Sequence, residues 1–443
     1  MANLELIDEI VNEVAKAREI NLPKICIKVL FLSYWMYCVN TYDLKYRNSF
    51  LGRNIRLNSG CIILCEKGTG KSLAVSLFKE LFSEVELERV KRYEKIKEVK
   101  IGSLERSMIP LNSSEKKQID DFYIQYGRKA AGIYRNVATS KSLCNTYASC
   151  KRYNVNNLLF NVDEAGKIFE DVFSKTPSIS AREFYQSINE LFDGFCGMGE
   201  SMVSKTESIE SQVDIGANFI FTSTNEFLKD YHVQKKYESS FAGGLARRLL
   251  YVNCPPIDLI NADANFYTYD VKQFKPQIAE ILKNMGRSRS IAFGEELKTI
   301  LAQPASKKGV IIFDEYLILL FCTTLAAWTG DEEIGVKHWN YMLSTFKEMK
   351  NITMDVIKDS STSYDKVCVF IREMTESTGK KKIAIVLIKD YCVRNKMCFD
   401  SKFKKWFETL CKDFTKTNVS KYIIEKNQMY AWLTDNFAFE GGK

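Results

Sequence analysis

Histidine is nearly absent from this chain, whose 443 residues contain only His232 and His338. We therefore expect neither a metal centre built on several histidines nor a catalytic triad with a histidine base. The sequence has 13 cysteines but no C-x-x-C pair, which favours reduced thiols in the cytoplasm over a disulfide scaffold.

Long hydrophobic runs are also missing. The longest apolar stretches are residues 29–39 and 317–328, and both fall short of the roughly 18 residues that a membrane-spanning helix needs. Residues 1–20 are acidic and helical in period, so we do not expect them to be a signal peptide. No membrane partner is expected.

Positive charge is present and unevenly distributed. The chain has a formal net charge of +8, and residues 380–426 alone carry thirteen Lys and Arg against five Asp and Glu, a local net charge of +8. A local basic patch indicates a polyanionic partner. A solvated lysine face explains the charge equally well at this stage.

A phosphate-binding loop is indicated by CEKGTGKS, residues 65–72, between an apolar strand at 60–65 and a helical pattern at 72–90. Such loops place backbone N–H groups around phosphates, a lysine on the β- and γ-phosphates and a hydroxyl on Mg²⁺. The usual first glycine is replaced here by Cys65, which we interpret as a tolerated small residue. The predicted nucleotide-binding residues are Gly68, Thr69, Gly70, Lys71 and Ser72, with Ser72 also a metal ligand.

Two further apolar strands end in polar residues. Residues 157–163 end in Asp163, which we expect to hold Mg²⁺ through water, and Glu164 follows as the base that polarises the attacking water. Residues 218–225 end in Asn225, which we expect to position that water. Alternation of these strands with helices predicts an α/β fold with a parallel sheet.

The ordered motifs resemble those of AAA+ ATPases, and in detail those of superfamily 3 and primase-associated helicases of phages and mobile elements. The resemblance covers residues 50–255 and rests on three stretches: TSKSLCNTYASCKRYNVNNLLFNVDEAG before and through the acidic strand, INELFDGFCGMGESMVSKTESI, and GGLARRLLYV. The last is similar to the Gly-Leu-x-x-Arg strand of minichromosome maintenance helicases. It implies an arginine finger at Arg247 that acts on a neighbouring subunit, although Arg248 stands where Phe is frequent.

The resemblance also implies ATP and Mg²⁺ as cofactors and a ring, expected to be a hexamer, with single-stranded DNA in a central pore. Hairpins of such rings carry basic residues that grip the DNA backbone, and Lys205, in a segment that follows Gly197 and Gly199, is the candidate here. A solvent-exposed lysine without a partner is the alternative. The chain has no room for the primase domain that accompanies many relatives.

The basic C-terminal segment predicts a winged-helix-like domain for duplex DNA. Residues 401–414 form an amphipathic pattern with Phe403, Phe407, Leu410 and Phe414 on one side, and two strands are expected around Asn427. A helical lid with a basic surface is the alternative. The candidate DNA contacts are Lys402, Lys404, Lys405 and Lys426.

These patterns predict a helical N-terminal region (1–50), an AAA+ core (51–260) with a charged helical insertion (84–130), a helical lid (261–359) and a winged-helix-like domain (366–443). The function that they favour is an ATP-driven DNA helicase or translocase for replication of a phage or mobile element. A non-helicase AAA+ remodelling or defence ATPase tethered to DNA is the alternative. A structural DNA-binding subunit with a silent site is a third hypothesis.

Overall fold

The computed structural model describes most of the chain, and the statements below concern these residues. The described ranges are 3–17, 19–48, 52–130, 132–134, 140–197, 203–204, 207–208, 211–229, 233, 236–237, 248–254, 269–304, 312–359, 363–394, 400–414 and 422–435. Contacts divide the chain into two compact units, Met1–Thr353 and Met354–Lys443, which are described separately.

The first unit contains thirteen described strands and most of the described helices. Its strands are β1 Lys45–Asn48, β2 Arg53–Arg56, β3 Gly60–Leu64, β4 Ile133–Tyr134, β5 Asn157–Val162, β6 Phe195–Cys196, β7 Val203–Ser204, β8 Glu207–Ser208, β9 Gln212–Val213, β10 Gly216–Ser223, β11 Leu249–Asn253, β12 Ser290–Phe293 and β13 Glu333–Ile334. Its helices are α1 Glu5–Val14, α2 Lys24–Thr41, α3 Lys71–Leu81, α4 Ser83–Glu105, α5 Ser113–Tyr126, α6 Ser140–Lys151, α7 Gly166–Val172, α8 Ile179–Phe192, α10 Lys275–Asn284, α11 Glu295–Leu301, α13 Ile312–Thr329 and, up to the boundary, α14 Val336–Asp359, with short 3-10 turns η1 Glu226–Lys229 and η4 Val271–Phe274.

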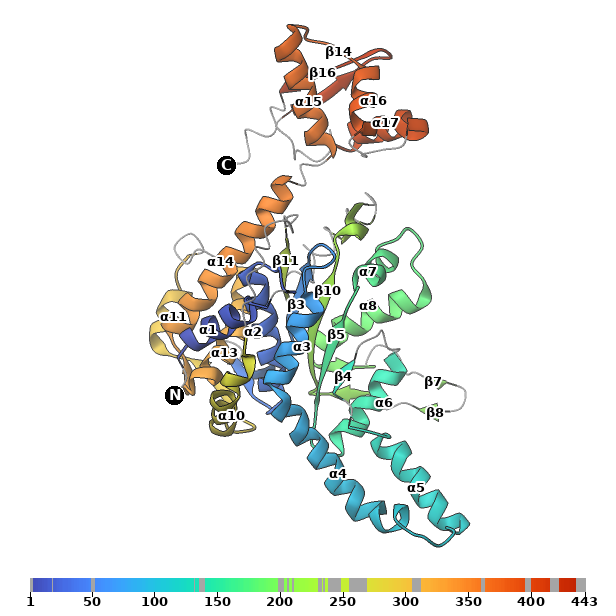
Figure 1. Cartoon of the computed structure of the whole chain (residues 1–443), viewed down its shortest axis with the longest axis vertical. Coiled ribbons are helices and arrows are strands. Elements are labelled where there is room, and N and C mark those ends of the chain that lie inside the picture. Colours follow the sequence, from blue (N-terminus) through green and yellow to red (C-terminus); the bar gives the residue numbers. More distant parts are fainter. Residues whose placement is uncertain are drawn as a thin grey trace. The chain divides into compact units, whose positions relative to one another are not determined.

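A five-stranded parallel sheet forms the centre of this unit, with the order β11-β3-β10-β5-β4 (Figure 1). The predicted α/β fold with a parallel sheet is therefore confirmed. Strand β3 is buried along its whole length, and its side chains alternate between the two faces. Cys61 and Ile63 join one hydrophobic core, whereas Ile62 and Leu64 join the other.

Helix α2 covers one face of the sheet and is buried almost completely, because its residues are apolar on all sides. The other face is covered by α6, α7 and α8 (Figure 1). The N-terminal helices α1 and α2 and residues 269–353 thus share one core with the sheet instead of forming separate bodies. Among the described helices, none combines the length and the apolar composition that a membrane crossing requires.

A second sheet, with the order β13-β12-β1-β2, joins segments that are distant in the sequence. Strand β1 pairs with β12 in parallel, so that Lys45 lies opposite Ser290, and with β2 as an antiparallel hairpin. Residues 45–48 and 290–293 were expected to continue helical regions, and that expectation is wrong. These strands form because they pair with distant segments of the chain, and the local sequence pattern does not predict that pairing.

The predicted charged insertion is a helical hairpin of α4 and α5. Helix α5 begins with a capping box in which Asn112 accepts from the Glu115 N–H and the Glu115 side chain accepts from the Asn112 N–H. Helix α4 is anchored at its base by Arg89, which is buried and hydrogen-bonded to Tyr37 of α2.

The second unit contains α15 Ser363–Thr378, β14 Ile383–Ala384, α16 Ile385–Arg394, η5 Asp400–Lys402, α17 Phe403–Phe414, β15 Tyr422–Lys426 and β16 Tyr430–Asp435. A three-stranded sheet, β14-β16-β15, packs with the helices around a separate small core. The predicted amphipathic helix and the two strands around Asn427 are confirmed, and Phe403, Phe407 and Leu410 are buried. Helix α15 begins at Ser363, slightly before the predicted start of the winged-helix-like domain at residue 366.

Candidate functional site

The loop after β3 has the backbone that the glycines predict. Gly68 and Gly70 both adopt left-handed conformations, with φ of +79° and +81°. A Cβ at Gly70 would lie 2.2 Å from the Glu19 carbonyl oxygen, so only glycine fits there. The segment before α2 packs on the loop, and the Asn21 N–H donates to the Thr69 carbonyl over 3.1 Å.

The side chain of Lys71 lies inside this loop. Its Nζ donates to the carbonyl oxygens of Cys65 (2.9 Å) and Glu66 (2.8 Å), and burial lowers the pKa of its ammonium group. The buried Thr69 hydroxyl donates to the Glu66 carbonyl over 3.0 Å. Helix α3 begins at Lys71, so its positive N-terminal end and the lysine occupy the same position.

The predicted metal ligands meet directly. The Ser72 Oγ donates to Asp163 Oδ2 over 2.5 Å, although the two residues lie 91 positions apart. The other carboxylate oxygen, Oδ1, accepts from Thr222 Oγ1 over 2.9 Å and from the Glu164 N–H over 3.1 Å. A hydroxyl and a carboxylate are hard oxygen ligands of the kind that Mg²⁺ prefers, so Ser72 and Asp163 fit this ion.

Thr222 belongs to the site although the sequence patterns did not select it. It lies near the end of β10, which separates β3 from β5 in the sheet, and it is buried. Its side chain orients the Asp163 carboxylate from the neighbouring strand. The neighbouring Ser223 is placed similarly, with its Oγ accepting from the Gly166 N–H over 2.9 Å.

Glu164 has an unusual backbone for a non-glycine residue. Its φ is +56°, and its side chain is exposed and ion-paired with Lys167. Left-handed conformations at such residues cost free energy and concentrate at functional sites. The turn directs the chain from β5 into α7 directly beside Asp163.

The structure describes only some of the remaining predicted residues. Asn225 is half-buried just beyond β10, at the carboxyl edge of the sheet, and its carbonyl accepts from the Leu228 N–H over 3.1 Å. Arg248 precedes β11 at the amino edge, where it pairs with Asp193 over 3.1 Å and donates to the Asn189 carbonyl. Arg247 and Lys205 lie outside the described residues, although β7 and β8 on either side of Lys205 pair in antiparallel fashion.

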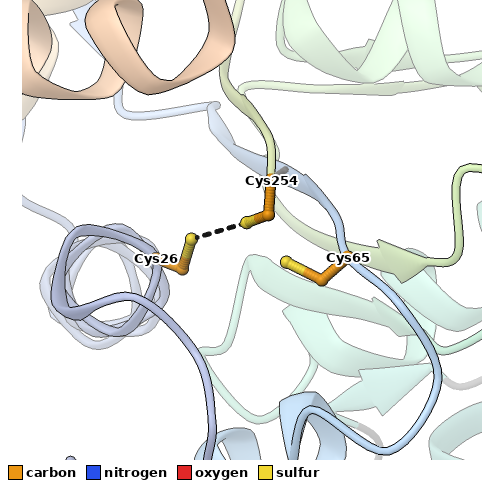
Figure 2. Close-up of side chains that lie close together, drawn as sticks. All are labelled: Cys26, Cys65 and Cys254. Atoms are coloured by element: carbon orange, nitrogen blue, oxygen red, sulfur yellow. Dashed lines mark hydrogen bonds between the residues drawn. The ribbon is translucent and has the colours of Figure 1, made fainter. Parts of the chain in front are cut away.

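Cys65 is part of a buried group that the sequence analysis missed. Its Sγ, with those of Cys26 and Cys254, forms a trio in which all three atoms lie within 4.8 Å of one another (Figure 2). Hydrogen bonds from the Cys254 and Cys26 thiols, with the nearby charge of Lys71, lower the pKa of the Cys65 thiol to about 5. The side chain at the first-glycine position is thus buried against two other cysteines.

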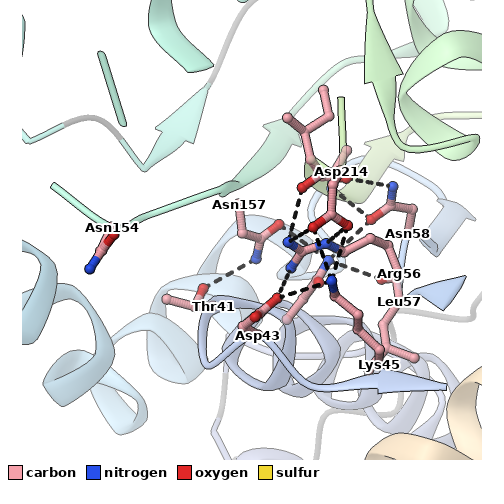
Figure 3. A network of polar contacts seen from close by, with 12 residues as sticks. Thr41, Asp43, Lys45, Arg56, Leu57, Asn58, Asn154, Asn157 and Asp214 are labelled. Carbon is pink, nitrogen blue, oxygen red and sulfur yellow. Dashed lines mark hydrogen bonds and ion pairs between the residues drawn. The ribbon is translucent and has the colours of Figure 1, made fainter. Parts of the chain in front are cut away.

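The opposite edge of the sheet carries a polar network with a different character (Figure 3). Arg56 binds Asp214 through Nε (2.9 Å) and Asp43 through a terminal nitrogen (2.5 Å), and Lys45 adds a 2.9 Å ion pair to Asp214. Burial by itself would raise the pKa of the Asp214 carboxyl, but the hydrogen bonds of Arg56 and Lys45 outweigh it and lower the pKa.

In the second unit the candidate DNA-binding lysines lie on and before α17. Lys402, Lys404 and Lys405 are exposed, opposite the buried face of the helix. Lys426 is half-buried at the end of β15, with its Nζ 4.0 Å from a Glu408 carboxylate oxygen. Phe414 ends α17, and its side chain lies outside the described residues.

Comparison with protein-family models and with curated proteins finds no match to this chain. The functional argument therefore rests on the geometry described above.

Proposed function

We propose that this chain is a Mg²⁺-dependent ATPase of the AAA+ type that uses hydrolysis to translocate along or unwind DNA. The convergence of Lys71, Ser72 and Asp163 at the carboxyl edge of a parallel sheet carries this proposal. Ligands of open α/β sheets bind at this edge, where the connections of neighbouring strands diverge. Counted along the chain, the strands of this sheet stand in the order five, one, four, three, two, with the loop after the first.

Each residue has a role that its position supports. Lys71 and the α3 N-terminus bind the phosphates, while Ser72 and Asp163 would hold Mg²⁺, which when bound would neutralise the phosphate charge that develops during transfer. Thr222 keeps the Asp163 carboxylate oriented. Glu164 is the exposed carboxylate beside the metal ligand and acts as the base toward water. Asn225, at the same edge, positions that water.

In this proposal, an arginine from a neighbouring subunit completes the ATP-binding site. Arg248 stands at the amino edge, opposite Lys71, and is engaged by Asp193 of its own chain. It is therefore a poor candidate for the finger. The role remains with Arg247, acting on a neighbouring subunit of a ring.

The second unit has the order of elements expected of a winged-helix-like domain, which supports DNA as the partner. The order helix, strand, two helices and a two-stranded hairpin suits such a domain, and α17 would present its lysines to the phosphate backbone. Replacing Lys402, Lys404 and Lys405 with Ala should lower the log–log salt slope of duplex binding by up to about three units. The matched control replaces Lys91, Lys95 and Lys116, exposed lysines of α4 and α5, and should leave the slope unchanged.

The decisive experiment for the DNA-dependent function compares ATP hydrolysis with and without single-stranded DNA, and then tests duplexes with a 5′ or a 3′ tail. Stimulated hydrolysis and unwinding of one tailed substrate are expected. A hydrolysis rate that single-stranded DNA does not change, together with no strand separation, would instead support the second candidate. That candidate is a remodelling or defence ATPase that the basic unit tethers to DNA.

A further inference from the structure

The trio of cysteines beneath the phosphate loop is not used by the proposed ATPase chemistry. Its members come from three separate elements: Cys26 from the first turn of α2, Cys65 from the position after β3, and Cys254 from the position after β11. All three side chains are fully buried and point toward one another (Figure 2). Buried cysteines are common in this chain, so the convergence of three is the informative observation.

Strand pairing holds two of these residues side by side. In the parallel pair of β11 and β3, Asn253 lies opposite Leu64, so Cys254 and Cys65 follow at equivalent positions. The Cys254 N–H donates to the Leu64 carbonyl over 2.7 Å, and the Cys65 N–H donates to the Ser223 carbonyl over 3.0 Å. The backbone of both residues is therefore anchored in the sheet, and α2 brings Cys26 to them from the covering layer.

The distances suit a metal ion with sulfur ligands. A zinc–sulfur bond of about 2.3 Å places the sulfur atoms of a tetrahedral site about 3.8 Å apart. The Sγ atoms of Cys26 and Cys254 lie 3.0 Å apart, and no pair of the three exceeds 4.8 Å. Side-chain rotations that move each sulfur by less than about 1 Å would convert this arrangement into three metal ligands.

Nearby positive charge favours the thiolate of Cys65, the form that binds metal, whereas Cys26 and Cys254 must give up their protons when the ion binds. Lys71 donates to the Cys65 carbonyl, so a positive charge lies beside the trio, and the positive end of α3 is next to it. Sulfur ligands select thiophilic ions such as Zn²⁺ over Mg²⁺, which prefers oxygen. The trio and the Ser72–Asp163 pair would thus hold different ions at neighbouring positions.

We propose that Cys26, Cys65 and Cys254 form a binding site for a thiophilic metal ion, with Zn²⁺ as the ion to test. Binding replaces three thiol protons, which are released to solvent, with one ion shared by α2, the phosphate loop and the end of β11. The ion would hold the start of the loop, where relatives of this loop type have a flexible glycine. This proposal does not depend on ATP hydrolysis.

The test uses the full-length protein, purified under reducing conditions, with metal content measured by mass spectrometry. About one Zn²⁺ per chain is expected after exposure to Zn²⁺ and removal of loose ions. Under anaerobic conditions, added Co²⁺ should give the near-ultraviolet charge-transfer absorption of thiolate ligation. Zn²⁺ should also raise the melting temperature, since it binds the folded state.

Cys26→Ser should lose at least nine tenths of the bound metal and most of the charge-transfer absorption, while circular dichroism confirms that it folds. Two controls should retain both signals: Cys61→Ser, on the same strand as the loop, and Cys144→Ser, whose thiol lies 3.1 Å from Cys196 in a separate pair. The proposal fails if wild-type protein binds no stoichiometric Zn²⁺ and shows no cysteine-dependent Co²⁺ absorption. It also fails if the trio binds no metal but two of its cysteines form a disulfide under mild peroxide, because these two thiols would then act as a redox pair.

Discussion

The two edges of the five-stranded sheet carry polar groups of opposite character. At the amino edge, Asn40, Asn157 and Asn218 are buried and lie within hydrogen-bond distance of one another through Asn40 Nδ2. At the carboxyl edge, Ser72 and Asp163 meet at the surface, and Glu164 is exposed with a strained backbone. Buried polar groups that are hydrogen-bonded to one another stabilise a fold, whereas exposed groups on a strained backbone remain available to a ligand.

This difference gives each edge its own expected response to mutation. Changes at the carboxyl edge should alter catalysis and leave stability nearly unchanged. Changes at the amino edge should lower stability and leave the intrinsic hydrolysis rate of the folded protein nearly unchanged. The predictions below run from the largest expected effect to the smallest.

Glu164→Gln should slow ATP hydrolysis by a factor on the order of 10² or more, because the amide cannot accept a proton from water. ATP binding and the free energy of unfolding should stay close to the wild-type values. Glu170→Gln, an exposed carboxylate on the following helix, is the matched control and should hydrolyse ATP normally. Steady-state phosphate release measures both variants, and a wild-type rate in Glu164→Gln would contradict the assignment of this turn.

Arg56→Ala should lower the free energy of unfolding by about 2 kcal/mol, because it removes the charged hydrogen bonds to Asp214 and the ion pair with Asp43. Arg53→Ala, an exposed arginine on the same strand, should change it by less than about 0.5 kcal/mol. Urea unfolding of both variants tests the claim. Equal stabilities would show that the amino-edge network does not stabilise the fold.

Thr222→Val should lower ATP hydrolysis about tenfold, the effect of losing one hydrogen bond of about 1.5 kcal/mol to the charged Asp163 carboxylate. If Thr222 positions a metal ligand, as proposed, raising the Mg²⁺ concentration should restore most of the rate. A rate loss that Mg²⁺ does not change would point to a general packing defect instead.

Asp214→Asn should destabilise the protein by about 1 kcal/mol at neutral pH, the upper range for partly exposed ion pairs. The folded pKa of Asp214 is lowered, so its contribution is complete above the unfolded pKa of about 3.9 and disappears as the pH falls through the folded pKa. The stability difference from wild type should therefore be constant between neutral pH and about pH 5 and shrink below about pH 4. Urea titrations at several pH values check this, and a difference that grows on acidification would reverse the assigned sign.

Local patterns predicted the carboxyl edge well, because strand, loop and helix are short-range features there. The apolar strand, Gly68, Gly70 and Lys71 are contiguous, and the parallel arrangement of strands brought Asp163 to Ser72 as expected. Thr222 was missed because a threonine near a strand end has no distinctive pattern. Its role appears only when β10 is placed between β3 and β5.

The amino edge and the cysteine trio were not predictable in the same way. The pairing of β1 with β12 joins residues about 245 positions apart. A strand of four residues has too short a pattern to predict which strand it pairs with. Cys26, Cys65 and Cys254 have no motif spacing, and only the packing of α2 on the sheet brings them together.

Phosphate release from ATP by wild-type protein and by Lys71→Ala, with and without Mg²⁺ and single-stranded DNA, tests the central claim most directly. The account predicts hydrolysis that requires Mg²⁺, is stimulated by DNA and is lost in Lys71→Ala, while circular dichroism confirms that this variant folds. Absence of phosphate release from the wild-type protein under all of these conditions, or an unchanged rate in Lys71→Ala, would contradict it.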